Sequence, residues 1–485
     1  MTRKPAVLGG PPAFPGGLPF VRVSVPPLDR VTERLRPSYE AGRLTDGPLV
    51  RTLEEEAAEH LGAQHVVAVS SGTAGLMLAI RVIAPLGRAV LLPSFTFSAS
   101  AHAVAWNGLV PRFADSDGRT FHLDHNDAEF RLGDAGVIMP THLFGAPCAA
   151  ERFEALARRT GTALIFDAAH GFGATRQGRT VGSFGDAEVF SLSPTKLLTS
   201  GEGGLVATPH DDVARSLRSG RDYGNSSNDE FQFVGLNARM SELHAAVALE
   251  ALVDIDAKLA RRRELGRRYS RHIDEIPGLR SQAIDDGDEV TYKAYSIVVE
   301  PEYGVERDVL IDALQAEGIE TRRYFWPAVH EQRPYASSGT AELPVSSDLA
   351  SRVVTLPIWP AMSDADVDTI ADVLTTIRSW PRREGAAPGA SPTMRNGADR
   401  WERDERTLLR CAPTFVMLLS PDGDEPIVLR GTGVALWHAL DRAQNTEELA
   451  NRLAAEFDAD PAAVRSDIEP VIARLSAAGV LRAVS

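Results

Sequence analysis

Short apolar runs alternate with helical patterns over the middle of the chain, from Val66 to Ala207. The runs comprise residues 66–69, 89–92, 110–113, 136–139, 163–166, 187–190 and 205–207. Runs of this length that alternate with amphipathic helices are typical of buried strands in a parallel sheet. We therefore predict a mostly parallel sheet that is covered by helices on both faces.

Helical patterns also precede and follow this region. Two helices are expected between Val31 and Leu61, separated by a loop at 42–48, and one long helix is expected from Met240 to about Ile276. A strand pattern and two amphipathic helical patterns follow at 292–300, 309–314 and 365–377. These later elements predict a second, smaller α+β domain.

The chain changes character after Trp380. Residues 381–406 have no apolar period, and their composition is typical of a linker. Residues 407–485 have the pattern of a β-hairpin and three helices, with Asn445 and Glu448 capping the second helix and Asp460 and Pro461 opening the third. We therefore expect the chain to end in a separate small domain that is similar to a winged helix.

The composition and the charge exclude some classes of function. A chain of 485 residues, 44% hydrophobic and 24% charged, has the length for two or three domains. Its net charge of −15 disfavours a nucleic-acid partner. Residues 408–485 hold seven arginines, no lysine and eleven acidic residues, hence a net charge of −4, so a DNA-reading domain is not expected there.

The two cysteines, Cys148 and Cys411, lie too far apart in the sequence to predict a disulfide framework or a metal cluster. A reducing compartment, the cytoplasm, fits this usage. The sequence contains neither the pattern of a secretion signal nor an apolar stretch of about 18 residues. We therefore expect a cytoplasmic protein without a membrane span.

One lysine, Lys196, lies in the turn between the runs at 187–190 and 205–207. A lysine amine forms a Schiff base with an aldehyde when its surroundings depress its pKa, and pyridoxal phosphate is the usual aldehyde. Asp167 ends the run at 163–166, so its carboxylate should face the crevice at the carboxyl end of a strand and keep a pyridinium nitrogen protonated. A solvated loop lysine and a helix-capping aspartate are the alternatives.

A third stretch, Ser-Ser-Gly-Thr-Ala-Gly-Leu at 70–76, lies at a strand-to-helix turn, where small residues let backbone N–H groups approach a phosphate. Together the three stretches resemble the DegT/DnrJ family of pyridoxal-phosphate aminotransferases, best known for acting on nucleotide-linked keto sugars. The resemblance continues at 93–100, 220–224, 234–243, 318–325 and 356–360. It spans about Leu18 to Trp380.

The resemblance implies an α/β fold like that of aspartate aminotransferase. The expected parts are a loose arm at 1–17, a cofactor-binding domain with its entry helices at 18–255, a small α+β domain at 256–380, a linker at 381–406 and the tail domain at 407–485.

The resemblance also implies roles for particular residues. Lys196 and Asp167 are the expected catalytic residues, and no metal is expected. The expected cofactor-binding residues are Gly72, Thr73, Phe97, Asp167, His170, Ser191, Lys196 and Asn237. Phe97 should stack on the ring, while His170, where relatives more often have Gln, should reach the phenolic oxygen or else be a core histidine. Gly72, Thr73 and Ser191 match phosphate-binding positions.

Asn237 matches an asparagine that, in relatives, reaches the phosphate of the neighbouring subunit, so a homodimer is expected. The sequence departs from the family directly before Lys196, where Leu192 and Ser193 replace a frequent Phe-His pair.

The tail resembles a second family. Leu-Arg-Gly-Thr-Gly-Val-Ala-Leu-Trp at 429–437, followed by Thr-Glu-Glu-Leu at 446–449, is similar to PqqD-like domains, which bind the leader segment of a ribosomal precursor peptide as an added strand. We therefore expect an aminotransferase in natural-product biosynthesis that moves an amino group from an amino acid donor, glutamate, to a keto or aldehyde acceptor on a recruited peptide.

Three other functions are alternatives for this sequence. One is a nucleotide-linked keto-sugar aminotransferase in which the tail has a structural role. Another is a sugar dehydratase of the same fold, but its members carry histidine where this chain has Lys196. The last is an inactive, ligand-sensing regulator, which the Lys196 and Asp167 pair and the acidic tail disfavour.

Overall fold

The structure is a computed structural model of the whole chain. It describes residues 4–84, 89–226, 230–336, 342–379, 400–412, 415–420, 426–430, 432–440, 444–457 and 459–484. The chain divides into two compact units, one formed by 18–307 with 320–371 and the other by 1–17, 308–319 and 372–485. The expected linker falls outside the described residues from 381 to 399. Within the described residues, each helix is too short or too polar to cross a membrane.

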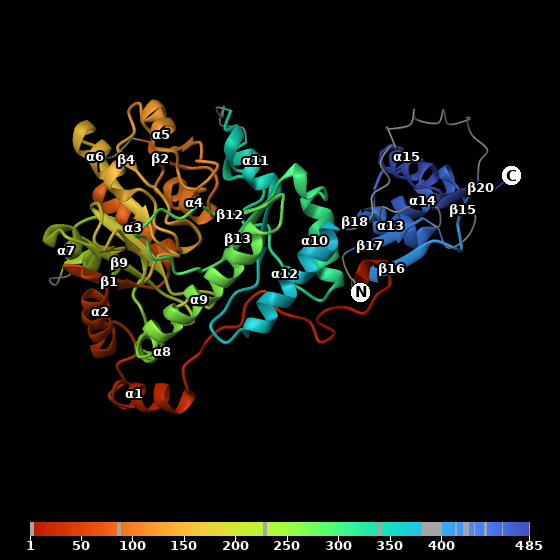
Figure 1. Cartoon of the computed structure of the whole chain (residues 1–485). Helices are drawn as coiled ribbons and strands as arrows, with labels where there is room; N and C mark the ends of the chain where they lie inside the picture. Colours follow the sequence, from red (N-terminus) through yellow and green to blue (C-terminus); the bar gives the residue numbers. More distant parts are fainter. Residues whose placement is uncertain are drawn as a thin grey trace. The chain divides into compact units, whose positions relative to one another are not determined.

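A seven-stranded sheet forms the centre of the first unit (Figure 1). Its order is β1 (His65–Val69), β9 (Gly204–Thr208), β8 (Ala187–Ser191), β5 (Ala163–Asp167), β4 (Val137–Ile138), β2 (Val90–Pro93) and β3 (Pro111–Ala114). Strands β8, β5, β4, β2 and β3 pair in parallel, whereas β9 is antiparallel to both β8 and β1. All seven apolar runs therefore form strands, and the prediction of a mostly parallel sheet is confirmed.

Helices pack on both faces of this sheet. They include α2 (Pro48–Leu61), α3 (Gly72–Ile83), α4 (Ser98–Trp106), α5 (His125–Arg131), α6 (Ala150–Thr160) and α7 (Asp211–Gly220). Because side chains alternate along a strand, Val66 of β1 joins the hydrophobic cluster that contains Leu53 of α2, whereas Val67 joins the cluster that contains Leu76 of α3.

The expected long helix at 240–276 is in fact two helices, α8 (Glu242–Leu252) and α9 (Ile255–Asp274). Asp254 has φ −116° and ψ 19°, which is outside the helical region, so the helix is interrupted at this residue. The apolar spacing continues through the break, because residues on both sides of it are buried. Helix α1 (Leu28–Glu40) and α2 are the two helices expected near the N-terminus.

A three-stranded antiparallel sheet follows, in the order β12 (Leu279–Ser281), β13 (Tyr295–Val299) and β14 (Val353–Leu356). Helices α10 (Arg307–Ala316), α11 (Pro344–Arg352) and α12 (Asp364–Arg378) belong to the same stretch of sequence. The remaining short elements are η1 (Ala6–Leu8), η2 (Leu143–Gly145), η3 (Pro301–Tyr303), η4 (Val329–Glu331), β6 (Thr175–Arg176), β7 (Arg179–Thr180), β10 (Asn225–Ser226) and β11 (Glu230–Phe231).

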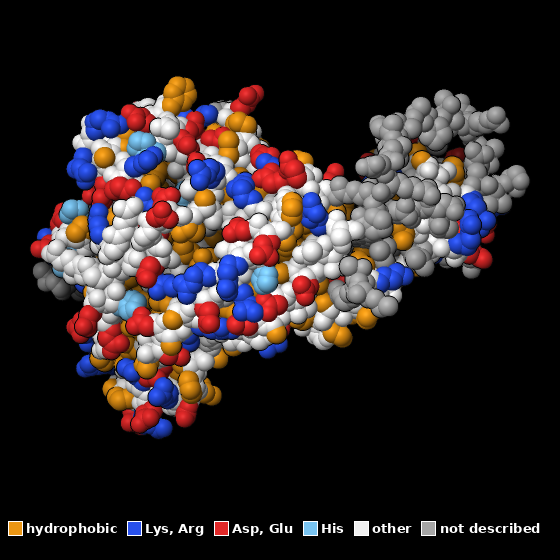
Figure 2. Space-filling model, viewed as in Figure 1, with side chains coloured by type: hydrophobic (Ala, Val, Ile, Leu, Met, Phe, Trp, Pro, Cys, Tyr) orange, Lys and Arg blue, Asp and Glu red, His pale blue; other side chains and the backbone are white. Residues whose placement is uncertain are grey.

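Acidic and basic side chains are interspersed on the face drawn in Figure 2. Part of this mixing reflects ion pairs between helices. Arg268 of α9 binds Asp368 of α12 through two hydrogen bonds of 2.6 Å, and it also pairs with Asp364 at 3.1 Å.

The described residues of the C-terminal stretch form two small sheets and three helices. The strands are β15 (Arg400–Arg403), β16 (Leu408–Ala412), β17 (Phe415–Leu419), β18 (Pro426–Arg430), β19 (Gln444–Asn445) and β20 (Leu481–Val484), and the helices are α13 (Thr432–Ala439), α14 (Thr446–Phe457) and α15 (Pro461–Ala477). The expected capping pair is present, because Asn445 and Glu448 each accept a hydrogen bond from the other's backbone N–H. Strand β15 lies within the stretch expected to be linker. Its Trp401 packs into the core of the C-terminal domain, so this part of the stretch belongs to that domain.

Candidate active site

A cavity of about 200 Å³ lies where the carboxyl ends of β5 and β8 meet the N-terminus of α3. Seven of the eight predicted cofactor-binding residues line it, namely Gly72, Thr73, Phe97, Asp167, His170, Ser191 and Lys196. These residues are far apart in the sequence and belong to different strands, helices and loops. The fold therefore brings the predicted chemistry to one place.

Lys196 lies in the loop between β8 and β9, and its backbone N–H donates to Ser193 O at 2.9 Å. Burial lowers the pKa of the Lys196 amine from 10.5 to about 8, although the charge of Asp167 raises it in part. A larger fraction of this amine is therefore uncharged at neutral pH than in an exposed lysine, and only the uncharged amine is a nucleophile.

Asp167 ends β5 and is buried, with 4% of its surface exposed. One carboxylate oxygen accepts a hydrogen bond from Ser100 Oγ at 2.5 Å, and the other accepts from the backbone N–H of Ala169 at 3.1 Å. Both donors are neutral, and Asp167 makes no ion pair with any residue that the structure describes. A protonated pyridinium nitrogen would supply the missing positive charge, so this carboxylate fits that group.

The N-terminus of α3 provides a cradle for a phosphate. Ser71 caps the helix by accepting from the N–H of Ala74 at 3.1 Å, and the first two residues of the helix, Gly72 and Thr73, line the cavity. A Cβ on Gly72 would lie 2.9 Å from Ser191 Cβ, and a Cβ on Gly204 would lie 2.6 Å from the Ser71 carbonyl carbon. Only glycine permits these close approaches, and the helix dipole favours an anion at this position.

His170 lines the cavity and is held by a backbone hydrogen bond. The N–H of Phe144 donates to Nδ1 of His170 at 3.1 Å, so the ring proton of the neutral histidine is on Nε2. Burial, and then the charges of Lys196, Lys293 and Arg262, hold the pKa of His170 well below 6.5. A neutral imidazole that donates through Nε2 fits the phenolic oxygen of pyridoxal phosphate.

Phe97 forms an apolar wall of the cavity. Its side chain is 56% exposed, and its ring centroid lies 5.8 Å from that of Phe325. An exposed aromatic ring at a cavity is suited to stack on a second planar ring.

Asn237 does not line the cavity of this chain. It is exposed and forms an isolated β-bridge with Asp222. Its expected role across a subunit interface concerns a second chain, so that role stays a prediction.

Sequence reasoning missed two polar residues that neighbour the residues lining this cavity. Ser100 holds Asp167, and a lone serine in a helix carries no recognisable signal. Lys293 is 7% exposed, and its ammonium lies 5.4 Å from the Tyr324 ring centroid without a hydrogen bond or ion pair to the described residues. Burial, and then the charges of Lys196 and Arg262, hold its pKa well below 10.5. The signal for Lys293 was its rarity, because the chain has only four lysines.

Comparisons with known proteins agree with this geometry. The model of the DegT/DnrJ/EryC1/StrS aminotransferase family matches residues 29–375, and that of coenzyme PQQ synthesis protein D (PqqD) matches residues 416–481.

Among curated relatives, the chain is 34% identical to spore coat polysaccharide biosynthesis protein SpsC of Bacillus subtilis, over 72% of this chain and 94% of the relative. It is 33% identical to GDP-perosamine synthase of Caulobacter vibrioides, over 68% of this chain and 90% of the relative. Among solved structures, DesI in the presence of its TDP-sugar product matches with a TM-score of 0.72 and 36% identity, over 77% of this chain and 96% of DesI. The chain, which ends in a PqqD domain, therefore belongs to the DegT/DnrJ/EryC1/StrS aminotransferase family.

Proposed function

We propose that this aminotransferase uses pyridoxal phosphate to move an amino group from an amino acid, glutamate, to the keto group of a nucleotide-linked sugar. The observation that carries the proposal is the single cavity shared by Lys196, Asp167 and the N-terminus of α3. The names of similar proteins support the sugar: one is a GDP-perosamine synthase, and another was solved with a TDP-sugar product. They favour a sugar over the peptide-borne carbonyl that the sequence had placed first.

Each residue of the site would have its own role in this reaction. Bound pyridoxal phosphate supplies an aldehyde that carries the amino group and a ring that accepts electrons. Lys196 Nζ would hold the aldehyde carbon and, once released, take the proton that leaves the α-carbon of the donor. Asp167 would hold the proton on the ring nitrogen, and His170 would donate to the phenolic oxygen. Phe97 would orient the ring and exclude water from one face.

We also infer that the functional unit is a homodimer. Asn237 lies in a segment that carries exposed apolar side chains, those of Tyr223, Phe231, Val234 and Leu243. Large apolar side chains clustered on a surface are typical of an interface. A two-fold dimer would bury them and bring Asn237 to the partner's phosphate cradle. Sedimentation of Val234→Asp, which should weaken the dimer, tests this inference.

The experiment that tests the function measures the two half-reactions separately. Purified protein is first converted by glutamate, and the spectrum of the cofactor reports the conversion. The converted protein is then mixed with nucleotide-linked keto sugars, and amino-sugar product is measured by mass spectrometry. Wild-type protein should complete both steps, and Lys196→Ala should complete neither while it remains folded. Glutamate conversion in Lys196→Ala would contradict the assignment of this lysine.

The PqqD match at residues 416–481 supports a second candidate for the amino acceptor. Domains of this kind favour a peptide partner, so the acceptor would be a carbonyl on a ribosomal peptide held by the tail. The same converted protein, mixed with an aldehyde-bearing peptide instead of a sugar, distinguishes this candidate. Amination of the peptide but not of any nucleotide-linked sugar would reverse the order of the two candidates.

A further inference from the structure

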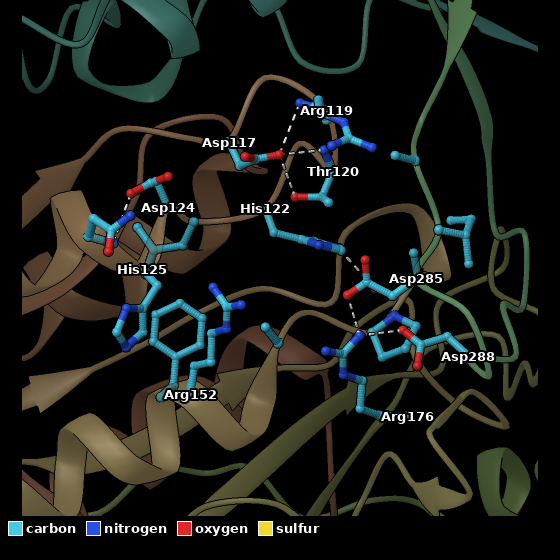
Figure 3. Close-up of a pocket in the computed structure, with 18 residues that line it drawn as sticks. Asp117, Arg119, Thr120, His122, Asp124, His125, Arg152, Arg176, Asp285 and Asp288 are labelled. Atoms are coloured by element: carbon cyan, nitrogen blue, oxygen red, sulfur yellow. Dashed lines mark hydrogen bonds and ion pairs between the residues drawn. The ribbon is translucent and has the colours of Figure 1, made fainter.

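A second cavity, of about 360 Å³, lies in the same unit and shares no lining residue with the active-site cavity. Its walls are the loop after β3, the loop after η2 with the first turn of α6, Arg176 of β6, and the loop after β12 (Figure 3). A volume of this size lies in the range of small-molecule sites. Nothing in the proposed transamination uses these residues.

Every carboxylate that lines this cavity already has partners within the protein. The four are those of Asp117, Asp124, Asp285 and Asp288. Asp117 accepts three hydrogen bonds from the turn that follows it, and Asp124 caps helix α5 with two. Asp285 and Asp288 both bind Arg176, at 2.6 and 2.7 Å (Figure 3). Each of these carboxylates is therefore already engaged in hydrogen bonds with the protein, and Arg176 also binds Glu151.

Two arginine side chains at the cavity lack such hydrogen bonds, although Arg119 interacts electrostatically with Asp117 and Arg152 with Glu151. The guanidinium groups of Arg119 and Arg152 line it, and neither makes a hydrogen bond or an ion pair within the described part of the chain. A guanidinium presents a planar fork of donors that matches phosphate and carboxylate oxygens. A carboxylate can be satisfied by one such fork, whereas a phosphate has enough oxygens for two. The lining thus favours a phosphate.

His122 adds a hydrogen-bond acceptor to the cavity. Its ring lies near the middle of the view in Figure 3 and is 7% exposed. Nε2 lies 3.1 Å from the carbonyl oxygen of Ala146 and donates to it, which leaves Nδ1 without a partner among the described residues. Burial, and then the charge of His142, lower the pKa of His122 to about 3, so the ring is neutral and Nδ1 accepts. An acceptor at the cavity without a partner among the described residues favours a ligand that brings a donor, such as a hydroxyl group.

We propose that this cavity binds a phosphate monoester that carries hydroxyl groups, the chemical class of a sugar phosphate. Arg119 and Arg152 bind the phosphate, and Nδ1 of His122 accepts from a hydroxyl. This site is separate from the active site and does not depend on the proposed transamination.

The test is calorimetric titration of full-length protein saturated with pyridoxal phosphate, so that the cofactor's own phosphate site is filled. The probes are glucose 6-phosphate, methyl phosphate, which has the phosphate without hydroxyls, and glucose, which has the hydroxyls without phosphate. Glucose 6-phosphate should bind with a Kd of about 1 mM or tighter, methyl phosphate roughly tenfold more weakly, and glucose without measurable heat. Arg152→Gln should weaken binding of both phosphates about tenfold.

Arg158→Gln is the matched control, because Arg158 is exposed on the same helix, lies outside the cavity and makes no hydrogen bond or ion pair with described residues. It should leave both Kd values unchanged. Equal affinity of wild-type protein for the two phosphates would overturn the role of His122, and this comparison needs no variant that alters the buried ring. Absence of binding, or equal binding by wild-type protein and Arg119→Gln/Arg152→Gln, would overturn the site.

Discussion

The amine of Lys196 is held in surroundings that favour its uncharged form. Its pKa of about 8 lies well below the 10.5 of an exposed lysine, and burial is the main cause. Because the uncharged amine is the reactive form, this difference should appear directly in the rate at which protein without cofactor captures pyridoxal phosphate.

We expect this capture rate to rise steeply as the pH increases from about 7 to about 9 and then to level off, because the uncharged fraction saturates above the pKa. The measurement is stopped-flow absorbance of the cofactor over a pH series. A rate that keeps rising towards pH 10.5, as for an exposed lysine, would contradict the burial of the amine.

Asp167 is positioned by Ser100 and by the backbone of Ala169, so its carboxylate is ready for a cation. Asp167→Asn should loosen cofactor binding and reduce turnover by orders of magnitude, since a neutral amide cannot hold a proton on the ring nitrogen. Cofactor release during dialysis and turnover with glutamate measure the two effects. Ser100→Ala, which removes only the positioning hydroxyl, should give a smaller loss of the same kind. Unchanged kinetics in Asp167→Asn would reduce Asp167 to a strand-end cap.

Lys293 should destabilise the fold near neutral pH. Its folded pKa lies below 10.5, so between the two values the unfolded chain binds more protons, and stability rises with pH in that window. Lys293→Met should therefore be more stable than wild type near pH 7, by about 1 to 3 kcal/mol, and the gain should shrink as the pH approaches 10.5. Urea unfolding at both pH values measures this. Lys258→Met, which removes an ion pair with Asp254, should show no such gain.

At the scale of elements, the start of α2 depends on a carboxylate from another helix. Glu242, the first residue of α8, accepts from the N–H groups of Gly47, Leu49 and Val50 at 2.9 to 3.1 Å and from Ser38 Oγ at 2.7 Å. This buried carboxylate satisfies free N–H groups of α2 and places negative charge at its N-terminus. It thus fixes the end of the loop at 42–48.

Glu242→Gln should lower the free energy of unfolding by about 1.5 to 3 kcal/mol. The NH2 group of the glutamine amide would face backbone N–H groups, which are also donors, and the negative charge would be lost. Chemical denaturation followed by circular dichroism measures the loss. Glu56→Gln, an exposed change on α2, serves as control and should be neutral. Equal stability of the two variants would show that the cap contributes little.

The strands of the central sheet could be predicted because an apolar run between helical patterns has few other outcomes. The break at Asp254 could not, because the apolar spacing continues through it and only the backbone angles change. Strand β15 was missed because a single tryptophan, Trp401, anchors it in a polar stretch. At the site, motif residues were predictable from family resemblance, whereas Ser100 and Lys293 matter through three-dimensional contacts that leave no period in the sequence.

At the scale of the whole molecule, the tail lies apart in the sequence from the residues named for the cofactor. Every residue named for the cofactor lies at or before Asn237, whereas the PqqD match begins at residue 416. A tail that recruits a peptide acts only on the second half-reaction. Tethering would raise the local concentration of a peptide-borne carbonyl to roughly the millimolar range, and a free nucleotide sugar gains nothing from it.

Deleting residues 400–485 should therefore leave cofactor binding and the glutamate half-reaction nearly unchanged, and the KM for a nucleotide-linked sugar should change little. The KM for a peptide carbonyl should rise strongly if the tail binds that peptide. Both half-reactions are measured in full-length and truncated protein. Equal losses in both would show that the tail is a structural part of the enzyme.

The short helix η2 lies between the two cavities. Leu143 lines the active-site cavity and Phe144 donates to His170, while Ala146, directly after the helix, lines the second cavity and accepts from His122. If a ligand in one cavity shifts this helix, it changes the free energy with which the other cavity binds its own ligand. Thermodynamic linkage makes the exchange symmetric, so the factor by which a sugar phosphate alters cofactor affinity equals the factor by which the cofactor alters sugar-phosphate affinity.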